Sequence, residues 1–266
     1  SGYAEMLRSI CLRIEFIVQR KTKIAVTITS TQSGDGKTFI STNLAALYAM
    51  SGRPTVLLDM DIRKPNVHDK LGLTASAGVT NYLIGDCSLD DIILRNEAIG
   101  FDVIPAGTIP PNPGELIRSD KLTELLTILR ERYDYVVIDS SPVGLVPDAL
   151  ALIEQTDITL FVIRCMETDK RFAQQTLQNL SLNHKDKINL ILSDIMVNKS
   201  GGSYGYGYGY GYGYGYGYGY GYGNGGAYNK YGKYGKYGKY AGYYRSKLGK
   251  KPTDAPHQYI DDSDED

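Results

Sequence analysis

The residues best suited to chemistry in this sequence form a small, glycine-containing segment, STQSGDGKT, at positions 30–38. The segment follows the β-branched run IAVTIT and precedes a helical pattern. Backbone N–H groups in such a loop can surround phosphate oxygens, and the helix that follows adds its partial positive charge. Lys37 could reach the outer phosphates of a nucleotide, and the Thr38 hydroxyl could ligate Mg²⁺. An ordinary turn is the alternative, because the strict pattern would have glycine in place of Thr31. The predicted nucleotide-binding residues here are Ser33, Gly34, Asp35, Gly36, Lys37, Thr38 and Phe39.

Two carboxylates end the next apolar run, TVLLDMD, with a basic pair just beyond them. Asp59 and Asp61 are two residues apart, so on a strand they would face the same side. Beside a nucleotide, such a pair could hold metal-bound water and accept a proton from an incoming hydroxyl. We add Arg63 to the nucleotide-binding candidates. A solvated loop after a strand is the alternative.

A third acidic residue, Asp139, ends the apolar run YVVID. A carboxylate at the tip of a buried strand is typical of the Walker B arrangement, in which it would hold Mg²⁺ through water, opposite Thr38. A strand-ending Asp in a turn is the ordinary alternative. The predicted metal ligands are therefore Thr38, Asp59 and Asp139, and the predicted catalytic residues are Lys37, Asp59, Asp61 and Asp139.

A regular alternation of apolar runs and helical patterns must position these side chains. Strands are expected at 24–29, 55–59, 101–107, 135–141, 158–164 and 188–198, and helices at 3–20, 38–50, 115–132, 147–155 and 169–182. This alternation predicts an α/β fold with a doubly wound, mostly parallel sheet. Ligands of such sheets bind at the carboxyl ends of the strands, where all three motifs stand.

Composition divides the chain near residue 200. Residues 201–266 hold 18 of the 23 tyrosines and 19 of the 30 glycines. We therefore predict a globular domain at 1–200 and a flexible, disordered Tyr/Gly-rich tail at 201–266. The net charge of −1 argues against a strong nucleic-acid binder. No apolar run is long enough for a membrane span, and three scattered cysteines indicate a cytosolic compartment. The missing initiator Met suggests a fragment.

The three motifs resemble those of the bacterial protein-tyrosine kinases, the BY-kinase family. SGDGKT matches that family's Walker A loop, VLLDMDIR its Walker A′ motif and VVIDSSP its Walker B motif. The resemblance covers roughly residues 3–200 and implies a P-loop fold of the MinD/ParA type, with ATP and Mg²⁺ as cofactors. It implies transfer of the γ-phosphoryl group to tyrosine, with Asp59 or Asp61 as the proton acceptor, and an adenine contact near Asn198. Gln32 stands where MinD/ParA proteins usually carry an additional lysine, which favours the kinases.

One motif of the family is incomplete at the start of the chain. The family carries ExxRxxR on its first helix, in contacts that build a ring of subunits. This chain has Glu5 and Arg8, but Cys11 replaces the second arginine. The resemblance therefore implies a homo-oligomer with Glu5 and Arg8 as contact residues, and an ordinary i,i+3 surface pair is the alternative.

The tail is rich in tyrosine hydroxyls that a kinase could use. A flexible arm lets many hydroxyls enter one active site, and about 40 residues span roughly 35 Å, enough to reach a neighbouring subunit. An adhesive or aggregation-prone segment is the alternative. The predicted phosphorylation sites are Tyr204, Tyr206, Tyr208, Tyr210, Tyr212, Tyr214, Tyr216, Tyr218, Tyr220, Tyr222, Tyr228, Tyr231, Tyr234, Tyr237 and Tyr240.

The resemblance also implies a cellular setting. Such kinases regulate the synthesis and export of capsular or extracellular polysaccharide, beside or fused to a membrane-spanning chain-length regulator, at the cytoplasmic side of the bacterial inner membrane. The implied partners are a second copy of the chain, that regulator and a tyrosine phosphatase, with no nucleic acid. The competing function is a P-loop switch ATPase that uses the tail as an interaction element.

Overall fold

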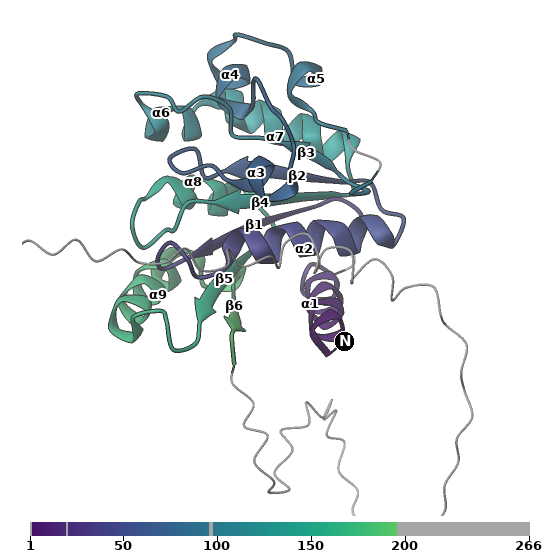
Figure 1. The fold of residues 1–266 in the computed structure, drawn as a ribbon. Coiled ribbons are helices and arrows are strands. Elements are labelled where there is room, and N and C mark those ends of the chain that lie inside the picture. The colour runs from purple at the N-terminus through teal and green to yellow at the C-terminus, as the bar shows by residue number, and fades with distance from the viewer. Residues whose placement is uncertain (1, 20, 96–97, 196–266) are drawn as a thin grey trace, which may run out of the picture. The chain divides into compact units, whose positions relative to one another are not determined.

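The computed structural model describes residues 2–19, 21–95 and 98–195, and these residues build one parallel sheet with helices on both faces (Figure 1). The strand order is β3-β2-β4-β1-β5-β6, and every pair of neighbours is parallel. This is the doubly wound α/β arrangement that the sequence predicts. The strands are β1 (Ile24–Ser30), β2 (Thr55–Met60), β3 (Asp102–Ile104), β4 (Tyr135–Ser140), β5 (Ile158–Arg164) and β6 (Ile188–Ser193).

Two helical layers enclose the sheet. One layer consists of α1 (Gly2–Ile17), α2 (Lys37–Met50) and α3 (Val67–Leu71). The other consists of α4 (Val79–Ile84), α5 (Leu89–Ile92), α6 (Pro113–Ile117), α7 (Asp120–Arg132), α8 (Asp148–Gln155) and α9 (Lys170–His184), and a 3₁₀ turn (Lys185–Lys187) precedes β6. Among the described residues, no helix combines the length and the apolarity that crossing a membrane requires.

Alternation along the central strands decides which side chains face α2. Val56 and Leu58 of β2 pack in the core beneath α7, whereas Leu57 packs in the core beneath α2. All three are fully buried, and each such side chain stabilises the fold by about 1.5–3 kcal/mol. Because the period of a strand is two residues, Asp59 faces the α2 layer, and Asp139 does so for the same reason, two residues after Val137.

The structure corrects several predicted boundaries. The helix predicted over 115–132 is two helices, because Ser119 adopts an extended N-cap conformation and Asp120 begins a new first turn. The strand predicted over 188–198 pairs only as far as Ser193, opposite the end of β5 at Arg164. The short helices α3, α4 and α5 were not predicted, since each has too few residues to show a helical period.

The first helix packs on α2 through a narrow apolar stripe. Leu7 and Ile14 are buried in the same core as Tyr48 of α2. Tyr48 stacks on Tyr135 of β4 with ring centroids 3.5 Å apart. Cys11 is half-buried against this core, and burial with the nearby Glu15 charge raises the pKa of its thiol to about 12. The position where the family has its second arginine therefore faces partly inward here.

Candidate active site

The phosphate loop connects β1 to α2 and depends on two glycines. Gly34 and Gly36 have φ of +92° and +101°, in the left-handed region where a Cβ is strained even though space is open around both positions. Gly36 also precedes the first residue of α2, so Lys37 and Thr38 occupy the first turn of that helix and are both buried. Backbone N–H groups at this helix start are free of helical partners and suit a phosphate.

The loop after β4 packs directly against the phosphate loop. The Gly144 N–H donates to the Ser30 carbonyl at 3.5 Å, and a Cβ at Gly144 would lie 2.3 Å from the Thr31 carbonyl oxygen. Only glycine allows this approach, because two backbones cannot both yield. The sequence contained no signal for this contact beyond the presence of a glycine.

Asp59 and Asp139 are direct neighbours across the sheet. The register of β2 and β4 pairs Asp59 with Asp139, and both side chains are buried. Asp59 accepts hydrogen bonds from the backbone N–H groups of Asp61 and Val67, both at 3.1 Å. Burial, together with the charge of Asp139, nevertheless raises the pKa of Asp59 to about 8. The strand order therefore places two carboxyl groups side by side, with Asp139 next to Thr38.

Asp139 has the features expected of a Walker B carboxylate. Burial raises its pKa to about 6, while a hydrogen bond with Thr38 and the charge of Lys37 act in the opposite direction. Its Oδ1 atom is buried and has no hydrogen-bond partner among the described residues. A polar oxygen left unpaired beside the Thr38 hydroxyl fits a magnesium ion with its bound water.

No group of three or more His, Cys, Asp or Glu side chains in the described part of the chain is arranged to enclose a metal by itself. Magnesium in phosphate-transfer sites is usually bound by few protein ligands together with phosphate oxygens and water. Thr38 and Asp139 match this pattern of few protein ligands completed by phosphate oxygens and water. The prediction that Asp59 is a metal ligand stays a prediction, since both of its oxygens already accept backbone N–H groups.

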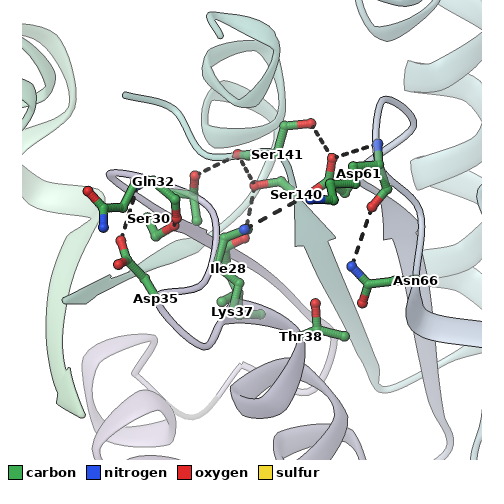
Figure 2. Close-up of polar contacts among 12 residues, drawn as sticks. Ile28, Ser30, Gln32, Asp35, Lys37, Thr38, Asp61, Asn66, Ser140 and Ser141 are labelled. Atoms are coloured by element: carbon green, nitrogen blue, oxygen red, sulfur yellow. Dashed lines mark hydrogen bonds and ion pairs between the residues drawn. The ribbon is translucent and has the colours of Figure 1, made fainter. Parts of the chain in front are cut away.

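Asp61 lies just beyond β2 and faces Lys37. Its Oδ2 is 4.0 Å from the Lys37 ammonium, and its Oδ1 accepts from the Ser141 hydroxyl at 2.9 Å (Figure 2). The backbone N–H of Lys64 adds a third contact at 3.3 Å. Asp61 is 8% exposed whereas Asp59 is 0% exposed, so Asp61 is the carboxylate of this pair that a molecule from outside can reach.

Arg63 and Asp35, both predicted to bind the nucleotide, lie at the site with their side chains bonded to other protein groups. The Arg63 guanidinium forms an ion pair with the buried Asp148 through Nε at 2.6 Å, which uses one of its five N–H donors. The buried Asp35 carboxylate accepts from the Gln32 N–H at 3.1 Å and from the Thr168 hydroxyl at 2.8 Å, which leaves its backbone as the part suited to phosphate. Ser33, Gly34 and Phe39 are exposed at the loop and at the start of α2.

Two groups of predicted residues remain, and the structure describes only the first of them. Glu5 and Arg8 form an ion pair on α1, and their side chains are 72% and 43% exposed. Asn198 and all the predicted phosphorylation sites, Tyr204 to Tyr240, lie outside the described residues. The predicted division of the chain at residue 200 also stays a prediction.

Ser141 and Lys70 were missed by sequence reasoning. Ser141 follows the Walker B motif and contacts Asp61, and its place after DS in VVIDSSP was the available signal. Lys70, on α3, is an exposed residue whose pKa is lowered by desolvation and by the Lys37 charge, while the Asp139 charge acts in the opposite direction. No sequence pattern separates Lys70 from other surface lysines, because Lys70 is itself exposed on a helix of five residues.

Two hollows lie near these elements. One of about 310 Å³ is lined by Cys165, Met166 and Glu167 after β5 and by Asp194 and Ile195 after β6. It adjoins the phosphate loop, since the Ser193 hydroxyl donates to the Asp35 carbonyl at 3.4 Å. The other, of about 540 Å³, lies between the loop after β4 and α9, and none of the predicted site residues lines it.

The fold and the site together define a P-loop nucleotide-binding domain. A family model described as an AAA domain matches residues 22–193. The same fold occurs in the septum site-determining protein MinD of Pyrococcus horikoshii, solved with Mg-ADP, with a TM-score of 0.52 at 22% identity over 63% of this chain and 67% of that one. The predicted P-loop fold of the MinD/ParA type is thus confirmed.

Several relatives are tyrosine kinases. The chain is 32% identical over 204 residues to the tyrosine-protein kinase YwqD of Bacillus subtilis, a match that covers 76% of this chain and 86% of that protein. It is 35% identical over 197 residues to the tyrosine-protein kinase ptk of Acinetobacter johnsonii, a match that covers 74% of this chain. The kinase domain of the Escherichia coli tyrosine kinase ETK superposes with a TM-score of 0.71 at 28% identity, over 84% of this chain and 82% of that one.

The chain therefore belongs to the bacterial protein-tyrosine kinases, as its motifs predicted. It is a tyrosine-protein kinase domain by family. It spans only 23–28% of the length of ptk and of three other long relatives, among them the putative kinase in the cps region of Klebsiella pneumoniae.

Proposed function

We propose that this chain transfers the γ-phosphoryl group of ATP to tyrosines of its own C-terminal tail, with one copy acting on another. The observation that carries the proposal is the convergence of Lys37, Asp61 and Asp139 at the carboxyl ends of three adjacent strands. The tail supplies closely spaced tyrosines at 204–240, with glycine or lysine between them.

Lys37 and the loop's backbone N–H groups would hold the β- and γ-phosphates of ATP. Thr38 and Asp139 would hold Mg²⁺, which when bound neutralises charge on the phosphates. Lys37 is buried and lies beside Asp61, so its ammonium group is preorganised rather than extended into solvent. Preorganised charge is worth more in phosphoryl transfer than charge that must be brought into place.

Asp61 is the better candidate for accepting the tyrosine proton. The O–H bond of the phenol breaks, its oxygen forms a bond to the γ-phosphorus, the bond from that phosphorus to the β–γ bridging oxygen breaks, and ADP leaves. Asp61 is partly accessible and 4.0 Å from Lys37, whereas Asp59 is fully buried with both oxygens hydrogen-bonded to backbone. Asp59 would then hold the Walker A′ segment in shape.

The nucleotide's base would occupy the hollow after β5 and β6. That hollow adjoins the phosphate loop, and its exposed Met166 and Ile195 offer apolar surface to an aromatic ring. The predicted contact from Asn198 would add to this side of the base.

Phosphorylation of the tail would act on assembly. Residues 201–266 carry a net charge of +2, and each phosphate adds about −1.5 to −2. Five phosphotyrosines would bring the tail to roughly −6 to −8, beside a domain that already carries −3. We propose that this repulsion disassembles a ring-shaped homo-oligomer in which Glu5 and Arg8 are contact residues, and that a tyrosine phosphatase restores it.

The relatives support a proposal for the cellular setting. We propose that the chain serves polysaccharide or capsule production at the cytoplasmic side of the inner membrane, with a membrane-spanning chain-length regulator as partner. The printed name of the Klebsiella relative, a putative kinase in the cps region, supports this setting.

Intact mass spectrometry after incubation with Mg-ATP tests the kinase function. We expect serial additions of about 80 Da, one per phosphate, on the wild-type chain, and none on Lys37→Met, because the phosphates lose their charge partner. Lys121→Met, which removes a lysine on α7, controls for the loss of one charge.

A mixture of wild type and isotopically labelled Lys37→Met tests transfer between copies. Phosphate on the labelled chain supports the proposal. ATP hydrolysis without any addition to either chain would instead support a P-loop switch ATPase, the function suggested by the fold shared with MinD.

A further inference from the structure

Asp35 and Thr168 connect two segments that are 133 residues apart in the sequence, the phosphate loop and the turn between β5 and α9. The Thr168 hydroxyl donates to Asp35 Oδ1 at 2.8 Å, while Asp35 Oδ2 accepts from the Gln32 N–H at 3.1 Å. Asp35 is 0% exposed. Because a buried carboxylate depends on its donors, these two hydrogen bonds hold the loop's shape. Figure 2 shows Asp35 bonded to Gln32 on the side of the loop away from Asp61.

The turn itself is held in an unfavourable backbone conformation. Met166 has φ +69°, which is strained for a residue with a side chain. The Thr168 hydroxyl accepts from the Arg164 N–H at 2.8 Å, and the Thr168 N–H donates to the Arg164 carbonyl at 2.9 Å. A single threonine side chain therefore closes the turn and reaches the phosphate loop at the same time. Gln32 adds a second connection, from its side-chain amide to the Glu167 carbonyl at 3.3 Å.

The same turn forms one wall of the 310 Å³ hollow. Cys165, Met166 and Glu167 line the hollow, and Thr168 follows directly in the chain. A molecule in the hollow would restrain the strained turn on one side, while the other side holds Asp35. The Thr168 hydroxyl thus joins the wall of the hollow to the phosphate loop, beside the hydrogen bonds from Gln32 and Ser193.

We propose that Thr168 is a positioning residue that couples base binding in this hollow to the shape of the phosphate loop, through its hydrogen bond to Asp35. The inference rests on the proposed function, because it takes the occupant of the hollow to be the base of ATP. The inference adds that the base raises the affinity for the nucleotide in two ways: through its own contacts in the hollow, and by improving the shape of the phosphate site. A triphosphate without a base does not restrain the turn, and so lacks this contribution.

The test compares two probes on the full chain, adenylyl imidodiphosphate and inorganic tripolyphosphate, each with Mg²⁺. Thr168→Val removes both hydrogen bonds of the hydroxyl at nearly constant volume. We expect the preference for the nucleotide, the ratio of the two dissociation constants, to fall about tenfold, as for a lost interaction of ~1.4 kcal/mol. Thr168→Ser, which keeps the hydroxyl, should retain the wild-type ratio. Thr127→Val, which removes an exposed hydroxyl bonded to its own helix, is the matched control.

Three outcomes would overturn the inference. An unchanged ratio in Thr168→Val shows that the hydroxyl does not couple the two subsites. Equal weakening of both probes shows that Thr168 shapes the phosphate loop alone. Additive effects of Thr168→Val and Asp35→Asn on nucleotide binding show that the hydrogen bond is not the connection. Asp35→Asn also serves if Thr168→Val fails to fold, since it should lower the ratio in the same direction. Failure of the wild-type chain to bind the nucleotide at all would reject the proposed function itself.

Discussion

At the scale of single residues, burial decides the roles of the acidic side chains. Asp59, Asp61 and Asp139 belong to two short motifs, yet they differ in exposure and in hydrogen-bond partners. Asp59 is enclosed, Asp139 has one oxygen without a hydrogen-bond partner in the described part of the chain, and Asp61 retains some accessible surface. The same carboxyl group can therefore support structure, bind a metal or accept a proton.

The raised pKa of Asp59 predicts how stability depends on pH. With a pKa of about 8, the folded chain keeps a proton that the unfolded chain releases above about pH 4. Stability should therefore fall as the pH rises from about 4 to about 8, and the raised pKa of Asp139 should add to the fall up to about pH 6. Thermal melts in EDTA without nucleotide should show a shallower decline for Asp59→Asn between pH 5 and 8. The exposed Glu124→Gln should keep the wild-type slope, and an equally steep decline in Asp59→Asn would contradict protonation of this carboxyl.

Asp61→Asn tests the assignment of the proton acceptor. A general base contributes about 10²–10⁴ in rate, so tyrosine phosphorylation should slow by at least 10²-fold. Binding of adenylyl imidodiphosphate should change little, because Lys37 and the loop remain. Quenched-flow measurement of phosphotyrosine gives the rate, and Asp69→Asn, an exposed carboxyl on α3, is the control. A wild-type rate in Asp61→Asn would show that another group accepts the tyrosine proton.

At the scale of elements, α2 is the piece that joins the site to the core. Its first turn carries Lys37 and Thr38, and its last turns pack against β4 through the Tyr48–Tyr135 stack. Packing of Tyr48 on Tyr135 therefore helps to hold α2, and with it the first turn that carries Lys37 and Thr38, in place. The two phenols differ in one respect: Tyr135 donates to Glu15 of α1 at 3.0 Å, whereas the buried Tyr48 hydroxyl has no hydrogen-bond partner among the described residues.

This difference predicts opposite effects of two similar substitutions. Tyr48→Phe removes an unsatisfied buried group, so the free energy of unfolding should stay equal or rise by up to about 1 kcal/mol. Tyr135→Phe removes a hydrogen bond to a carboxylate and should lower it by about 1 kcal/mol or more. Urea denaturation measures both. Equal losses in the two variants would indicate that the Tyr48 hydroxyl has a partner, such as a buried water molecule.

At the level of the whole molecule, the net charges of residues 1–200 and of the tail determine how phosphorylation would affect assembly. Phosphorylation would change the tail from a weakly positive to a strongly negative segment, while the domain stays at −3. Like charges of this size oppose close packing of subunits, and salt screens them with a Debye length of about 10 Å at 0.1 M.

Size-exclusion chromatography of phosphorylated and phosphatase-treated chain tests this assembly switch. The treated sample should elute earlier at low salt, and the difference should shrink at high salt because the repulsion is screened. Arg8→Ala should reduce assembly of the treated sample if Glu5 and Arg8 contribute to the contact. Identical elution volumes at every salt concentration would reject the switch.

Short stretches of sequence were enough to predict the class of fold and the kind of ligand site. Local spacing was sufficient for the phosphate loop at 30–38, for the acidic strand ends at Asp59 and Asp139, and for the alternation that predicts a parallel sheet. These features are encoded within a few consecutive residues, since a loop, a strand period and a helix start are all local. They also carried the resemblance to the tyrosine kinases.

Contacts between these groups became known only from the packed sheet. The tertiary structure paired Asp59 with Asp139, directed Arg63 to Asp148 and connected Asp35 to Thr168. Each contact depends on strand order or on register between segments 80 or more residues apart, and the same local pattern is compatible with several strand orders. The physical reason is that local preferences select elements, whereas packing of the whole sheet selects their neighbours.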